Sequence, residues 1–254
     1  MQSEKQYIDL YTEAQQLIKE HAAPVLNEVR DKAFEDFRRQ GFPTKKVERY
    51  KYTDMQKLFE PDYGLNLNRL EIPVNPYETF KCDVPNLSTS LYFIVNDQFY
   101  SKSLPKAKLN DGVIVDSLNH VATERPELVA KYYGRLANTE ADAITALNTM
   151  LAQDGLFIYV PKNVQLERTI QVINILRSDV DLMVNRRVLI VLEEGAKAQF
   201  LFCDHAADDR NFLATQVIEA YVGANANLEL NCLEETHAKN VRVSNVYIEQ
   251  QRDS

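Results

Sequence analysis

The sequence predicts a mainly β protein with an N-terminal helical region, whose strands form a right-handed parallel β-helix, a solenoid of stacked coils. Three observations support this fold class. Near the N-terminus, apolar residues recur every three or four positions, as they do on one face of a helix. From about residue 91 onward, short β-branched or aromatic runs follow one another. The last third of the chain repeats itself with a period of 28 residues.

The helical region comes first. Tyr7, Leu10 and Ala14 lie on one helical face, and Pro24 interrupts the pattern before a second amphipathic stretch begins. A glycine and a proline at positions 41 and 43 end that second stretch. We therefore expect helices separated by a break at Pro24.

The chain divides into three parts by composition. We expect an N-terminal helical region over residues 1–65, an extended connector over residues 66–86, and a β-helix over residues 87–254. The connector contains three prolines and little periodicity. Apolar residues at helical spacing predict a helical insertion in the β-helix near residues 127–151.

The 28-residue period gives the β-helix its expected register. Residues 195–202 align with residues 223–230, and every aligned apolar set keeps the same parity, so each coil would point the same positions inward. The coinciding positions include Ile170 with Ala198 and Ala226, Val172 with Phe200 and Leu228, and Ile190 with Ile218 and Val246. A β-sandwich remains the alternative, although nothing in a sandwich requires a constant offset.

The chain stops soon after a strand predicted at residues 245–250, in the middle of a coil. Because solenoids normally carry caps that cover their ends, we expect the β-helix to be truncated. The chain would then be the front part of a longer protein, or its open end would pair with another chain.

Composition excludes several function classes. The 254 residues carry 29 basic and 37 acidic side chains, a net charge of −8 that argues against nucleic acid as a partner. Only seven glycines occur, too dispersed for a phosphate-binding loop. No apolar run approaches the ~20 residues of a membrane span, so no membrane association is expected. The polar N-terminus and three scattered cysteines indicate the cytoplasm.

One group of residues has the composition of a metal site. Cys203 and His205 lie about one coil before Cys232 and His237, and thiolate and imidazole groups suit zinc or iron. However, a Cys-x-x-Cys pair is absent, and an offset of one residue beyond one coil would direct the two cysteines to opposite faces. We therefore predict no metal-binding residues.

No catalytic motif is present either. His21 and His120 lack partner motifs, so we expect surface or locally bonded imidazoles. The acid pairs at 193–194, 208–209 and 234–235 fall at strand ends, where they are typical of solvated corners. Without a nucleophile and base at a known spacing, we predict no catalytic and no cofactor-binding residues.

Two longer motifs resemble the SufB/SufD family, and SufD in particular. The first comprises Ala33, Phe37, Gly41 and Pro43 followed by residues 48–54. The second comprises residues 146–148, residues 154–161 and then Val164, Leu166 and Ile170; the turn at residues 194–196 is also similar to the coil corners of the family. The family usually has Trp where Tyr50 stands here.

The resemblance implies a non-catalytic scaffold subunit of the SUF iron–sulfur cluster assembly complex. Its partners would be a SufB-like subunit, which pairs through the β-helix, and a SufC-like ATPase, which binds a C-terminal region missing from this sequence. The chain would bind no cofactor alone, and the iron–sulfur cluster would be present only in the assembled complex. A homodimer through the open solenoid end also stays open. No functional residue of the family can be assigned to a position here.

Two other functions remain as alternatives. The first is a β-helix carbohydrate-active enzyme with a carboxylate and calcium site, which would need acidic side chains from three coils in one groove. The second is a metal carrier that uses Cys203 and Cys232, which would lose bound metal when either cysteine is changed to serine.

Overall fold

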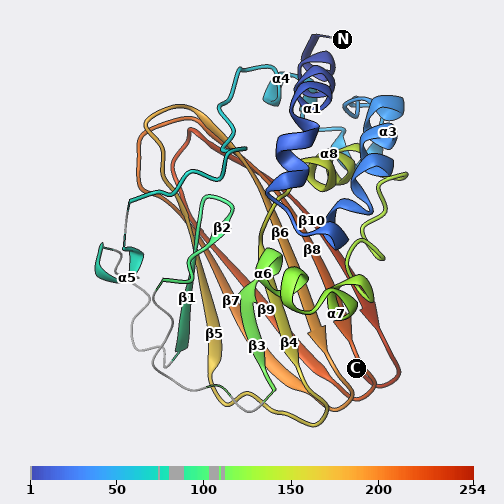
Figure 1. Cartoon of the computed structure of the whole chain (residues 1–254), viewed down its shortest axis with the longest axis vertical. Helices are drawn as coiled ribbons and strands as arrows, with labels where there is room; N and C mark the ends of the chain where they lie inside the picture. Colours follow the sequence, from blue (N-terminus) through green and yellow to red (C-terminus); the bar gives the residue numbers. More distant parts are fainter. Residues whose placement is uncertain (1, 74, 80–88, 103–108, 110–111) are drawn as a thin grey trace.

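The computed structural model describes residues 2–73, 75–79, 89–102, 109 and 112–254. The expected connector at residues 66–86 therefore lies partly outside the described residues. Cys82 also lies outside them. Helices form the N-terminal part, and the described strands form two sheets that face each other, in which most neighbouring strands run parallel (Figure 1). Within the described residues, no helix is long and apolar enough to cross a membrane.

Helices cover the beginning of the chain and one side of the solenoid (Figure 1). The helical elements are α1 (Gln2–Glu20), α2 (Pro24–Asn27), α3 (Arg30–Gln40), the 3-10 turn η1 (Glu48–Tyr50), α4 (Met55–Leu58), α5 (Pro76–Thr79), α6 (Leu118–Glu124), α7 (Pro126–Ala130) and α8 (Ala143–Leu151). The predicted N-terminal helices are confirmed, and the chain turns between α1 and α2 just before Pro24.

The described strands belong to two sheets, between which they alternate from β4 onward. They are β1 (Thr89–Val95), β2 (Gln98–Phe99), β3 (Ile114–Ser117), β4 (Leu156–Val160), β5 (Thr169–Leu176), β6 (Leu182–Leu192), β7 (Lys197–Ala206), β8 (Phe212–Val222), β9 (Asn227–Glu235) and β10 (Asn240–Gln250). One sheet has the order β2-β1-β5-β7-β9, and the other has the order β10-β8-β6-β4-β3. Successive coils pair in parallel, so the predicted β-solenoid is confirmed.

The coil register differs from the predicted 28-residue period. Ile170 pairs with Phe200, and Phe200 pairs with Leu230, so these coils are 30 residues apart. Only β8 and β10 keep the offset of 28 residues, which pairs Ile218 with Val246. The predicted and observed registers of these coils differ by two residues. Because side chains alternate between the two faces of a strand, the same residues face inward in both registers.

The corner geometry explains this shift. Gly195 has a positive φ of 68°, and Asn225 and Asn163 adopt similar values of 56° and 61° in the neighbouring coils. Glycine and asparagine tolerate this left-handed conformation better than other residues. Gly195 therefore stacks beside Asn225, whereas the sequence alignment placed it over Gly223.

The space between the two sheets is filled by inward-facing apolar side chains such as Ile158, Ile190 and Phe200. The outer face of the sheet that contains β6 is also apolar, where Met183 and Leu213 pack against α1, α3 and α8. Leu189 and Phe157 pack against α2, α6 and α7. The helices therefore cover one outer face of the solenoid.

The family-like motifs hold this helical layer in place. Ala33 and Phe37 are fully buried. The hydroxyl of Tyr50 donates to Asp142 at 2.7 Å, and Asp142 caps the start of α8 by accepting from the N–H of Thr145. Asn148 of α8 donates to the backbone carbonyls of Arg186 and Thr215 on β6 and β8. These motif residues join helices to sheet.

Candidate functional site

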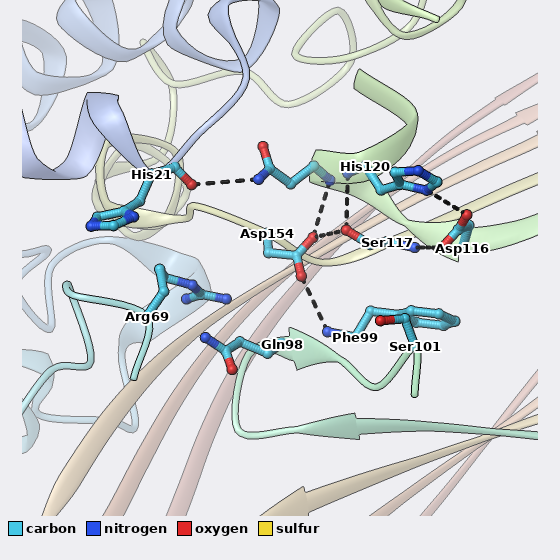
Figure 2. A pocket seen from close by; sticks show the side chains of 10 residues that line it. His21, Arg69, Gln98, Phe99, Ser101, Asp116, Ser117, His120 and Asp154 are labelled. Atoms are coloured by element: carbon cyan, nitrogen blue, oxygen red, sulfur yellow. Dashed lines mark hydrogen bonds and ion pairs between the residues drawn. The ribbon is translucent and has the colours of Figure 1, made fainter. Parts of the chain in front are cut away.

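A cavity of about 560 Å³ lies where the helical layer meets the first coil (Figure 2). Asp154 lines it and lies two residues before β4, which begins at Leu156. It is followed by Gly155, where a Cβ atom would lie only 2.0 Å from the carbonyl oxygen of Arg187. The close approach of the neighbouring coil therefore requires glycine here, and it fixes the position of Asp154.

The carboxylate of Asp154 joins three elements (Figure 2). Its Oδ1 accepts from the hydroxyl of Ser117 at 2.7 Å and from the N–H of Asn119 at 3.0 Å, at the start of α6. Its Oδ2 accepts from the N–H of Phe99 on β2 at 3.2 Å. Burial raises the pKa of Asp154, while Arg69 and the hydrogen bonds act in the opposite direction. The Asp154 carboxylate therefore connects β2 and the start of α6 to the segment before β4.

Ser117, His120 and Asp116 also line this cavity, but they do not form a nucleophile and base. The Ser117 hydroxyl is directed to Asp154, whereas Nδ1 of His120 lies 2.8 Å from Asp116 (Figure 2). Only the backbone N–H of His120 contacts the Ser117 oxygen. Since a nucleophilic serine needs the imidazole within hydrogen-bond distance, this geometry lacks the required contact.

The cysteines and histidines from the sequence lie apart. Cys203 faces outward and packs with Ile173 and Phe93, whereas Cys232 faces inward because it pairs with Phe202. His237 contacts the backbone carbonyl oxygen of Asp208 at 3.0 Å. The described residues contain no group of three or more His, Cys, Asp or Glu side chains that could hold a metal ion.

The acidic residues considered as calcium ligands have separate local contacts. Glu193 accepts from the hydroxyls of Tyr132 and Tyr159 at 3.2 and 3.3 Å. Glu194 pairs with Lys162, and Asp209 pairs with Lys239. These carboxylates are each engaged by neighbouring side chains.

The open side of the last coil is a second candidate site. Within the described residues, β9 and β10 each pair on one side only. Val246 and Ile248 stack on the core residues Ile218 and Ala220, yet they are 48% and 50% exposed. With the half-buried Leu228 and Leu230 of β9 they form an uncovered apolar surface, which we call the end face.

Sequence reasoning missed a set of buried charged residues. Arg186 and Arg187 are adjacent on β6 and face the solenoid interior and the helices, respectively. Arg186 pairs with Asp204, and Arg187 pairs with Glu219 at 2.6 Å. Two arginines between apolar residues of one strand could have indicated buried ion pairs, since charged residues are rarely buried unless paired.

Two family models match the chain and together cover nearly all of it. Residues 1–172 match the SufBD protein N-terminal region. Residues 174–254 match the SufBD core domain, described as SUF system FeS cluster assembly.

Individual relatives agree with these matches. A chloroplastic iron–sulfur cluster assembly SufBD family protein, ABCI8 of Arabidopsis thaliana, is 32% identical over 55% of this chain and 24% of its own length. The iron–sulfur cluster assembly protein SufD of Bacillus subtilis is 31% identical over 47% of this chain and 27% of its own length. A SufBD family protein of Synechocystis is 32% identical over 52% of this chain and 28% of its own length. The matched parts thus span about a quarter of the length of these relatives.

Proposed function

Because the chain belongs to the SufBD family, we propose that it is a non-catalytic scaffold subunit of the SUF iron–sulfur cluster assembly complex. In this role it pairs with a SufB-like subunit through its β-solenoid. The observation that carries the proposal is the pair of family matches, which cover residues 1–172 and residues 174–254.

The end face has the chemistry of a strand-pairing surface. A partner strand beside β9 or β10 would satisfy their outer backbone N–H and C=O groups. It would also cover Val246 and Ile248, and completing the burial of two such side chains contributes about 1–3 kcal/mol. A partner with the same solenoid cross-section fits best, since it continues both sheets.

The cavity around Asp154 supports the non-catalytic part of the proposal. Its hydroxyl and carboxylate groups are used to join α6, β2 and β4, so they serve the fold. Arg69, the guanidinium that lines the same cavity, pairs with Asp97 at 2.8 Å. This arrangement favours a structural over a reactive role.

The cluster is the cargo of such a complex, and we propose that it is bound only after the subunits assemble. The SufC-like ATPase implied by the family is assigned to no residue of this chain. We place the protein in the cytoplasm, without nucleic acid or membrane as a partner.

Co-purification with a SufB-like protein tests the proposal. We expect a one-to-one complex by light scattering, and Val246→Asp with Ile248→Asp should weaken binding at least about tenfold, because two charges would be buried. Val180→Asp is the matched control, since Val180 is exposed and lies outside the end face.

Two results would contradict the proposal. One is binding that the double variant does not change. The other is a light-scattering mass that corresponds only to two copies of this chain, which would make the homodimer the occupant of the end face.

A further inference from the structure

The cavity beside the first coil is lined by polar groups that the fold does not use. Its volume of about 560 Å³ lies within the range of small-molecule sites, which is roughly 300–1,000 Å³. The side chains of Gln98 and Ser101 and the imidazole of His21 line it, and none of them bonds to another side chain or carbonyl in the described part of the protein. These groups are available to a ligand.

Charges of opposite sign lie on two sides of this cavity. Figure 2 shows Arg69 on one side of Asp154 and Asp116 on the other. Burial raises the pKa of Asp154, and Arg69 is close enough to act in the opposite direction. Nevertheless, within the described ranges Arg69 pairs with Asp97 and forms no ion pair with Asp154 or Asp116. A guanidinium and two carboxylates therefore face one space without direct contact.

Both sides keep hydrogen-bonding capacity. Arg69 donates from Nη1 to Oδ1 of Asp97 at 2.8 Å and from Nη2 to the Asp97 carbonyl at 3.4 Å. Since a guanidinium has about five N–H donors, most of the donors of Arg69 remain. The Asp154 carboxylate accepts from three donors and the Asp116 carboxylate has two contacts. A carboxylate offers about four acceptor positions, so each can accept a further bond.

We propose that this cavity binds a zwitterion of the α-amino acid class. The ligand carboxylate pairs with Arg69, because guanidinium and carboxylate groups form charge-assisted, often bidentate hydrogen bonds. The ligand ammonium donates to Asp154 and Asp116 on the other side.

An inorganic cation fits less well, because the described residues contain no group of three or more His, Cys, Asp or Glu side chains that could hold one. The site uses no residue of the end face, so it is independent of the proposed pairing with a SufB-like subunit.

L-Alanine is the probe, and propionate and ethylamine are the comparisons, since each carries only one of its two charged groups. Isothermal titration calorimetry should give a dissociation constant for L-alanine at least about tenfold lower than for either comparison, because each of them lacks one charge-assisted contact. Crystals soaked in L-alanine should show its carboxylate at Arg69.

Two variants test the site itself. Arg69→Gln removes the partner of the ligand carboxylate, and Gln98→Phe narrows the cavity while it keeps every charged side chain. Both should weaken L-alanine binding at least about tenfold, and circular dichroism checks that they fold. Arg168→Gln and Gln165→Phe are the matched controls, because both residues are exposed and outside the cavity lining, and they should bind as the unchanged protein does.

The proposal is wrong if L-alanine binds no more tightly than propionate and ethylamine do. It is also wrong if Arg69→Gln and Gln98→Phe bind L-alanine as tightly as their controls.

Discussion

Arg186 and Arg187 are neighbours on β6, yet they lie in two different regions of the molecule. Arg187 faces the helical layer, where it pairs with Glu219 and donates to Thr149 at 2.9 Å. Glu219 also accepts from three backbone N–H groups of the loop after α7, those of Gly134, Leu136 and Ala137. Arg186 faces the solenoid interior, where it donates to the carbonyl of Asn96 and pairs with Asp204.

The difference between these two ion pairs is one of enclosure. Both Arg187 and Glu219 have side chains that are 0% exposed, and the chain surrounds them with helices and a loop. The Arg186 cluster adjoins a cavity and the partly exposed Arg242 at the open side of the last coil. The pair of Arg187 and Glu219 therefore fixes the helices on the sheet, whereas the pair of Arg186 and Asp204 joins the two sheets across the solenoid interior.

Glu219→Gln should cause the largest loss of stability. It leaves the buried guanidinium of Arg187 without its counter-charge, and breaking one side of a buried pair costs about 3–5 kcal/mol. Guanidinium chloride unfolding measures the change, with the exposed Glu249→Gln on the next strand as the control. A loss below about 1 kcal/mol would show that the enclosed pair contributes little.

Asp204→Asn should have a smaller effect, of about 1–3 kcal/mol, by the same measurement. Arg186 keeps the carbonyl of Asn96, and Arg242 keeps Glu234. If this substitution costs as much as Glu219→Gln or more, the distinction between an enclosed pair and an open cluster is wrong.

Asp154 is a further buried carboxylate, and it is held mainly by hydrogen bonds. The pH dependence of the stability tests its contribution. Burial raises the pKa of Asp154 in the folded state. Its contribution to the free energy of unfolding is therefore fully present below the unfolded pKa of about 3.9. It is lost as pH rises through the folded pKa.

The stability gap between the unchanged protein and Asp154→Asn should therefore widen as pH falls from 7 towards 4. At pH 7 the gap should be roughly 1 kcal/mol, from the lost acceptor. Urea unfolding across this range measures it, with Asp253→Asn as an exposed control. A gap that narrows in acid would mean that Arg69 and the three donors lower the folded pKa instead.

Arg242→Gln should have the smallest effect on stability, at most about 1 kcal/mol, because its side chain is partly exposed and its ion pairs are partly screened. Thermal unfolding measures this value. A loss as large as that of Asp204→Asn would place Arg242 with the enclosed residues.

The solenoid could be predicted from sequence because its inner positions alternate with a period of two. Phe200 and Leu228 lie on the same parallel ladder of β7 and β9, as the repeat predicts, although they are not directly paired. The register was wrong because two Gly-Ala pairs were aligned, whereas backbone conformation sets the corner. Asn225 adopts the same left-handed conformation as Gly195, and an alignment of identical residue types does not reveal this.

The buried charges could not be predicted for a different reason. The apolar run at residues 188–192 identifies a strand, but β6 begins six residues earlier and includes Arg186 and Arg187. Charged residues usually mark a strand end. Their partners, Asp204 and Glu219, are brought close only by the coil stacking, which is a property of the fold.

The strand predicted at residues 245–250 lies within β10, and its apolar residues Val246 and Ile248 are about half exposed. The polar end of the same coil was not expected, because Arg242 and Glu234 belong to different strands.

Hydrogen exchange with and without a SufB-like partner tests the central claim most directly. We predict slower exchange of backbone amides in β9 and β10, with little change in α1 or α3, because strand pairing at the end face would satisfy the free edges. Protection confined to the helical layer, or no protection in either strand while the complex forms, would contradict the account.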